Sequence, residues 1–102
     1  MSLKKSYAKD KASCKVTFEL PESAAFGADI VYLVGDFNNW SETSTPLKKS
    51  KEGMWATVLD LASGREYFFR YLIDGQRWEN DWNADKYVKS PYSDAENSVV
   101  IV

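Results

Sequence analysis

The sequence contains no histidine and only one cysteine, Cys14. Zinc sites and nucleophilic catalytic sites draw on histidine and on clustered cysteines, so their scarcity argues against both kinds of site. Cys14 also has no second cysteine with which to form an internal disulfide. We therefore assign no metal, no cofactor and no catalytic residue to this sequence.

The sequence also lacks a long apolar run and an excess of positive charge. No segment approaches the roughly 18 apolar residues that indicate a transmembrane helix. Charged residues rather than an apolar segment follow Lys4 and Lys5, so no signal peptide is visible. The net charge of −2 argues against nucleic acid, because phosphate binding needs a basic surface. We expect a cytoplasmic protein with no membrane or nucleic-acid partner.

Aromatic residues, in contrast, are abundant. They make up 15% of the 102 residues, with four Trp, six Tyr and five Phe, which is more than one small core needs. A chain of this length can bury a single core without disulfides. Residues 1–13 are polar and charged, so we predict a flexible N-terminal lead-in followed by one domain over residues 14–102.

The apolar pattern has the period of strands rather than of helices. Apolar and polar residues alternate from Cys14 to Leu20, and a run from Ile30 to Val34 indicates a strand buried on both faces. Further strands are predicted over 54–61, 66–73, around Trp78, and over 98–102, while 41–52 and 79–93 are predicted loops. Many short strands separated by turns predict an all-β sandwich.

Three motifs carry a family resemblance. They are Gly35-Asp36-Phe37-Asn38-Asn39-Trp40, Tyr71-Leu72-Ile73-Asp74-Gly75-Gln76-Arg77-Trp78 and Glu96-Asn97-Ser98-Val99-Val100. From about Lys15 to Val102 the chain resembles the isoamylase N-terminal early-set domain, carbohydrate-binding module family 48, which includes the glycogen-binding domain of the AMP-activated protein kinase β subunit. The resemblance implies an immunoglobulin-like (early-set) antiparallel β-sandwich. It also implies binding of α-1,4-glucans (glycogen, starch or maltooligosaccharides) or a place beside the catalytic barrel of branching and debranching enzymes.

The resemblance implies a carbohydrate site at three positions. Trp40 and Trp78 match the family's two stacking tryptophans, and Arg70 matches its strand lysine, a donor to sugar hydroxyls. The chemistry agrees, because the apolar faces of glucose stack on flat aromatic rings and its hydroxyls pair with short polar groups. The alternative for Trp40 is that it folds back to cap the edge of the sandwich.

Asn39, Tyr92 and Asn97 complete the predicted carbohydrate-binding set. The family's aliphatic, threonine and asparagine contacts fall near Tyr92, Asp94 and Glu96, which differ from them in type. Tyr92 can still stack on a sugar, and the Asn39 and Asn97 amides can hydrogen-bond to hydroxyls.

The turn at Asp74-Gly75 decides on which face Trp78 lies. A two-residue turn would pair Tyr71 with Trp78 and place the indole on the face opposite Arg70. A longer loop or a bulge would pair Leu72 with Trp78 and return the indole to the Arg70 face. We favour the second register, because it keeps the candidate residues together.

Other residues favour structural roles. Trp55 is expected in the core, and Trp82 is expected to clamp its charged loop onto the sandwich rather than extend a sugar site. The carboxylates between Glu79 and Asp85 are expected to be solvated, which argues against a glycosidase pair. Three functions remain open: non-catalytic glucan binding, docking of a glucan-processing enzyme or regulator, and an accessory piece of a glycoside hydrolase or branching enzyme.

Overall fold

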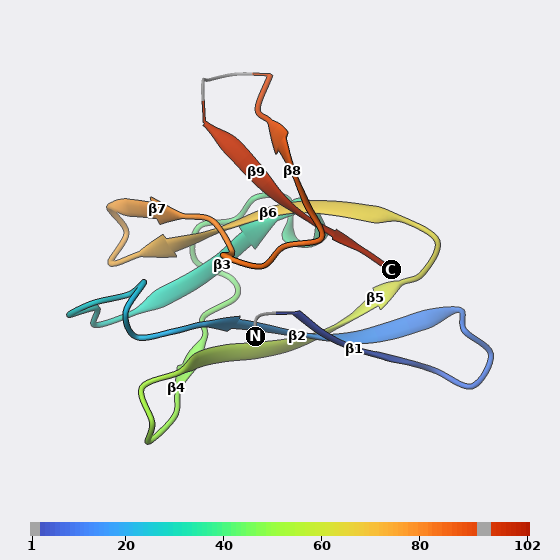
Figure 1. Ribbon diagram of the computed structural model, residues 1–102, viewed down its shortest axis with the longest axis horizontal. Helices are drawn as coiled ribbons and strands as arrows, with labels where there is room; N and C mark the ends of the chain where they lie inside the picture. The colour runs from blue at the N-terminus through green and yellow to red at the C-terminus, as the bar shows by residue number, and fades with distance from the viewer. Residues whose placement is uncertain (1–2, 92–94) are drawn as a thin grey trace.

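The computed structural model describes residues 3–91 and 95–102, and these form a sandwich of two antiparallel sheets (Figure 1). The first sheet has the order β1 (Leu3–Tyr7), β2 (Ser13–Leu20), β5 (Trp55–Ala62), β4 (Lys48–Lys49). The second has the order β3 (Val31–Gly35), β6 (Glu66–Ile73), β9 (Glu96–Ile101), β8 (Lys86–Lys89), and β7 (Arg77–Glu79) also pairs with β6. The predicted all-β, immunoglobulin-like sandwich is confirmed.

The core lies between the inner faces of the two sheets and follows from strand alternation. Val16, Phe18 and Leu20 point inward from β2 and are fully buried. Phe69 on β6 meets the Phe18 ring edge-on, with the ring centroids 5.0 Å apart. Burial of each large apolar side chain stabilises the fold by about 2 kcal/mol. The alternation of apolar residues along the strands therefore favours packing of these two sheet faces against each other. Cys14 and Trp55 belong to this core, as predicted.

Three segments depart from the predictions. The expected lead-in contains β1, which pairs with β2 from Leu3↔Phe18 to Tyr7↔Cys14, so residues 3–7 are an edge strand of the first sheet. The expected loop at 41–52 contains β4, which pairs with β5, and the expected loop at 79–93 contains β8, which pairs with β9. All three are edge strands with mostly exposed side chains, so none needed the apolar pattern by which strands were recognised.

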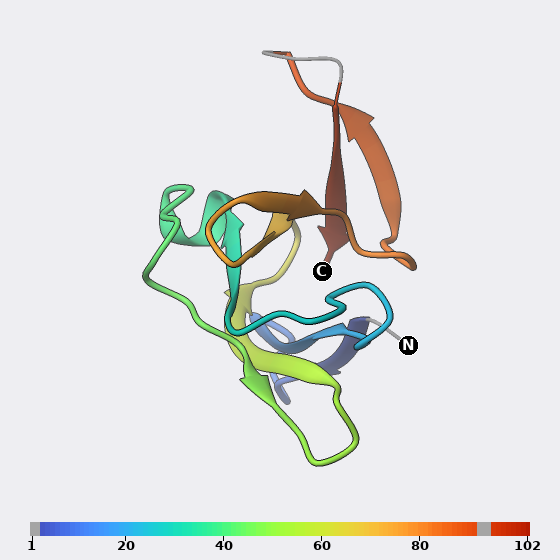
Figure 2. The same cartoon turned by 90° about the vertical axis from the view of Figure 1, so that its left-hand side faces the viewer.

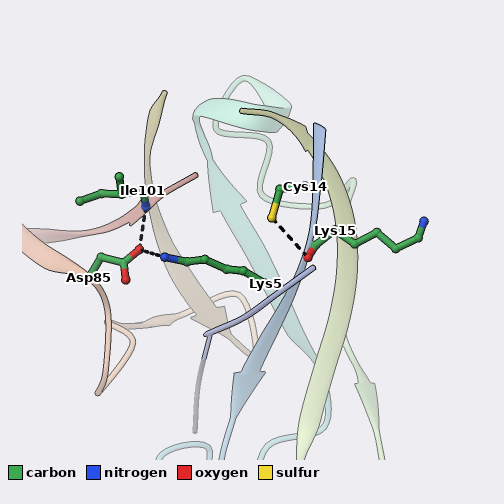
Figure 3. A network of polar contacts seen from close by, with 5 residues as sticks. All are labelled: Lys5, Cys14, Lys15, Asp85 and Ile101. Carbon is green, nitrogen blue, oxygen red and sulfur yellow. Dashed lines mark hydrogen bonds and ion pairs between the residues drawn. The ribbon is translucent and has the colours of Figure 1, made fainter. Parts of the chain in front are cut away.

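The second sheet is extended at one end by the β8–β9 hairpin, which projects away from the sandwich (Figure 2). The carboxylate of Asp85, just before β8, ties this part to the first sheet (Figure 3). Its Oδ2 accepts hydrogen bonds from Lys5 Nζ on β1 and from the backbone N–H of Ile101, each at 2.7 Å. One carboxylate thus links the edges of both sheets.

Two smaller predictions about side chains were wrong or incomplete. Trp82 does not clamp its loop, since its side chain is 53% exposed and its indole N–H donates to Glu79 Oε2 at 3.1 Å. Ile30 is also partly exposed, so the burial on both faces starts only at Val31.

Over the described residues, no helix is long and apolar enough to cross a membrane.

Candidate functional site

The outer face of the second sheet carries a second, smaller apolar layer. Val34, Leu72 and Val99 are at most 2% exposed, although they lie outside the core between the sheets. Strand pairing explains their common face, since Val34 lies opposite Arg70 and Leu72 lies one alternation further along β6. Because these residues are buried, other side chains must cover them, and those side chains form the candidate site.

The β6–β7 hairpin brings Trp78 to the Arg70 face. Leu72 pairs with Trp78 and Ile73 with Arg77, so the turn spans residues 74–76 and the favoured register is the observed one. Asp74 and Gly75 have left-handed backbones, with φ values of 55° and 68°. The turn is anchored, because Asp74 Oδ1 accepts from the backbone N–H groups of residues 29 and 30, at 2.8 and 3.0 Å.

Trp40 is positioned by the turn that ends β3. Gly35 is followed by a single 3₁₀ turn, η1 (Asp36–Asn38), and then by left-handed backbones at Asn39 and Trp40. The Asn38 side chain ties this turn to β3 by accepting from Gly35 N and donating to Leu33 O. Asn38 and Asn39 thus supply the turn chemistry that their sequence pattern predicts.

Polar contacts hold the two flat rings and the guanidinium. The Trp40 indole Nε1 donates to Asp36 Oδ1 at 2.9 Å. The Arg70 Nε donates to Asn97 Oδ1 at 2.7 Å, and the Arg70 Cζ lies 5.9 Å from the centre of the Trp78 ring. Trp40 and Trp78 remain 37% and 42% exposed, so both residues reach the molecular surface.

These residues line one open groove with a volume of about 650 Å³. Of the predicted residues, Trp40, Arg70, Trp78 and Asn97 line it; the rest of its lining is Val34, Asp36, Glu42, Phe68, Ser90 and Pro91. Asn39 is not among the lining residues and instead forms the C-cap of η1, in a left-handed conformation. Tyr92 lies outside the described residues.

Sequence reasoning missed several lining residues. Phe68 was detectable, because it is two positions from Arg70 on the same strand and must share its face. Asp36 was seen only as a turn residue, although its carboxylate faces the groove. Nothing in the sequence placed Glu42 and Pro91 at the groove. Both are loop residues, and the alternation of side chains along a strand predicts nothing about where a loop runs.

The carboxylates after β7 are not uniformly solvated, which corrects the prediction for Asp81 and for Asp85, whose side chain is 26% exposed. Asp81 is 1% exposed, and its Oδ2 accepts from the Tyr71 hydroxyl at 2.9 Å. Burial, followed by the nearby Asp81 charge, raises the pKa of Tyr71 well above its ordinary value. The pair lies away from the groove and has a structural role. In the described part of the chain, no cluster of three or more potential metal ligands occurs.

Comparison with known proteins identifies relatives of two kinds. The family model described as "Carbohydrate-binding module 48 (Isoamylase N-terminal domain)" matches residues 15–93. The 5'-AMP-activated protein kinase subunit beta-1 of Sus scrofa is 46% identical over 55 residues, which cover 54% of this chain and 41% of that protein. The Homo sapiens subunit is 44% identical over 55 residues, which cover 54% of this chain and 18% of that protein.

The second kind of relative is an enzyme. The 1,4-alpha-glucan branching enzyme GlgB of Aquifex aeolicus (strain VF5) is 38% identical over 58 residues, covering 53% of this chain and 9% of the enzyme. The chain thus spans less than half the length of these curated relatives.

Proposed function

The chain belongs to the carbohydrate-binding module 48 (isoamylase N-terminal domain) family, and on that premise we propose that it binds an α-1,4-glucan in the groove of the second sheet. The ligand is glycogen, starch or a maltooligosaccharide, and the role is binding without catalysis. The observation that carries the proposal is that Trp40, Arg70 and Trp78 line the same open groove.

The chemistry of the groove suits a neutral sugar chain. The exposed portions of Trp40 and Trp78 offer flat apolar surfaces for the C–H faces of two glucose units. An α-1,4-glucan curves, so two separate rings fit it better than one flat wall. Such stacking buries apolar area without requiring a charged ligand.

Arg70 supplies the hydrogen-bond donors in this proposal. Its Nε is engaged by Asn97 Oδ1, and among the described residues its terminal nitrogens make no hydrogen bond to protein. They therefore remain for sugar hydroxyls, which a guanidinium contacts in a planar, directional way. Asn97 is 4% exposed, so its role is to orient Arg70 rather than to offer a wide contact surface.

Titration of the protein with maltoheptaose, followed by tryptophan fluorescence, tests the proposal. We expect saturable quenching or enhancement in the wild type, and Trp40→Ala and Trp78→Ala should each weaken binding by at least about 30-fold, as loss of a central aromatic contact does. Trp82→Ala is the matched control, because Trp82 is 53% exposed but lies outside the groove. Wild-type affinity in either groove variant would contradict the proposal.

The relation to enzymes supports a second experiment. The branching-enzyme relative makes a glucan-processing partner a natural candidate. If maltoheptaose produces no response in the wild type, and a branching enzyme co-elutes with the protein, the docking function replaces glucan binding as the better explanation.

A further inference from the structure

The Trp40 ring is held in place by more contacts than an exposed loop residue requires. Its backbone has φ of 58°, directly after Asn39 with φ of 57°, and bulky side chains rarely adopt this left-handed conformation. The backbone N–H of Trp40 donates to the carbonyl oxygen of Gly35 at 2.8 Å, and its indole Nε1 donates to Asp36 Oδ1 at 2.9 Å. Strain of this kind persists only where the surroundings over-determine the conformation.

The second oxygen of Asp36 fixes the carboxylate itself. Asp36 Oδ2 accepts from the backbone N–H of Phe68 at 2.7 Å, and that N–H belongs to β6, the central strand of the second sheet. The carboxylate therefore bridges the indole of Trp40 and the rigid backbone beneath the groove. Both are hydrogen bonds to a charged acceptor, the stronger and more directional class.

We propose that Asp36 is a positioning residue that sets the plane of the Trp40 indole for stacking on a glucan. The inference rests on the function proposed above and adds a residue and a binding mode to it. Because the indole N–H is occupied by Asp36, Trp40 meets the sugar with its ring face alone. Hydrogen bonding to hydroxyls is left to Arg70, so the two sides of the groove recognise different parts of the sugar.

A purely structural role for Asp36 is the competing explanation. In that case the contact with Phe68 N–H would stabilise the turn after β3, and the contact with the indole would be incidental. The two roles differ in one respect: a positioning role acts through the Trp40 Nε1–H, whereas a structural role acts through the Phe68 N–H. Replacing Trp40 with phenylalanine removes the first donor and leaves the second.

A double-mutant cycle on the full chain separates the two roles, with maltoheptaose affinity measured by calorimetry. Asp36→Asn, a change of nearly constant shape, should weaken binding about tenfold in the wild-type background, the loss typical of a hydrogen bond to a charged group. In the Trp40→Phe background the same change should alter affinity less than twofold. Asp60→Asn is the matched control, because it removes the same charge from the first sheet, where Asp60 faces Lys15.

A second readout does not depend on the strength of sugar binding. In ¹⁵N-resolved NMR spectra of the free protein, Asp36→Asn should shift the Trp40 indole Nε1–H resonance and speed its exchange with solvent at least about tenfold, since a hydrogen-bonded proton exchanges only after the bond opens. The Trp82 indole, bonded to Glu79 instead, should not change.

Two results would overturn the inference: an affinity unchanged by Asp36→Asn, or an equal loss in the wild-type and Trp40→Phe backgrounds. An unchanged Trp40 indole resonance would overturn it as well. Failure of the wild type itself to bind maltoheptaose would instead overturn the proposed function on which the inference rests. The two failures are therefore distinguishable.

Discussion

The outer faces of the two sheets differ although both belong to the same sandwich. The outer face of the first sheet carries two ion pairs, Lys4 with Glu19 at 3.3 Å and Lys15 with Asp60 at 3.2 Å, and the second is exposed at both side chains. The outer face of the second sheet buries Val34, Leu72 and Val99 under aromatic and polar side chains. The outer face of the first sheet is charged. The outer face of the second sheet has a buried apolar layer beneath its aromatic and polar side chains.

The comparison shows what a strand face needs before it can hold a ligand. A charged strand face gains little from its ion pairs, because exposed pairs contribute about 0–1 kcal/mol. On the second sheet, a buried apolar layer supports Arg70 and the two tryptophans from below. If the groove binds a glucan as proposed, this support would fix the side chains in advance, so less conformational entropy would be lost on binding.

The largest effect is expected for Gly35→Ala, at the end of β3 beneath the groove. An added Cβ would lie 2.5 Å from Phe68 O and 2.8 Å from Phe69 Cβ, and the backbone oxygen cannot move aside without shifting β6. Overpacking of this kind costs about 3 kcal/mol in the free energy of unfolding, measurable by urea denaturation. Gly64→Ala is the control, because an added Cβ there has open space and meets only the strain of φ at 78°. An equal cost at both positions would show that Gly35 is not a packing constraint.

A smaller effect is expected for Tyr71→Phe, which removes the donor to the buried Asp81. Removing the donor to the buried Oδ2, while Oδ1 still accepts from the backbone N–H of Asn83 at 2.8 Å, should lower the free energy of unfolding by about 2 kcal/mol at pH 7. The groove lies on the opposite face of β6, so glucan affinity should not change. Affinity that falls with stability would mean that the two faces of the second sheet are coupled.

The same pair predicts a pH dependence. The pKa of Tyr71 is raised by folding, so its stabilising contribution is complete below the ordinary tyrosine pKa of about 10 and is lost as the pH rises toward the raised value. The difference in unfolding free energy between wild type and Tyr71→Phe should therefore stay constant from about pH 7 to 9 and narrow above about pH 10. A difference that widens at alkaline pH would contradict this sign.

Asp85→Asn tests the link between the sheets and should cost less. Lys5 and the Ile101 N–H both donate to Asp85 Oδ2, and the Lys5 and Asp85 side chains are only 24% and 26% exposed. We expect a loss of about 1 kcal/mol in urea denaturation, part of which should disappear at high salt. Since this link is remote from the groove, maltoheptaose affinity is the internal control.

The smallest effect is expected on the outer face of the first sheet. Lys15→Ala breaks a pair whose side chains are both 65% exposed, so the unfolding free energy should change by less than about 0.5 kcal/mol. A loss comparable to that of Asp85→Asn would show that the outer ion pairs of the first sheet stabilise the fold after all.

The sequence predicted the β-sandwich, and of the predicted site residues Trp40, Arg70, Trp78 and Asn97 line the groove. The alternation of apolar and polar residues in β2 and β6 determines which side chains face the core. The family motifs match Trp40 and Trp78 to the two stacking tryptophans. The register at Asp74-Gly75 was open, because two turn geometries fit the same residues and put Trp78 on opposite faces. The turn over residues 74–76, anchored by the Asp74 carboxylate, decides between them.

What the sequence could not provide are contacts made by single side chains across long separations. Asp81 was expected in water, but its carboxylate is buried against Tyr71, and its backbone N–H donates to Ser98 Oγ on β9. Asp36 reads as a turn residue, and its bond to the backbone of residue 68 follows only from the pairing of β3 with β6. Edge strands β1, β4 and β8 were not predicted because their mostly exposed side chains give no apolar alternation.

The most direct test of the central claim is to map the surface that maltoheptaose contacts, by following backbone and side-chain N–H resonances during a titration. We predict that the largest changes occur at the Trp40 and Trp78 indoles and the Arg70 Nε–H, while residues on the outer face of the first sheet, such as Lys15 and Val58, do not shift. Changes centred on the first sheet, or a complete absence of changes at saturating sugar, would contradict the account.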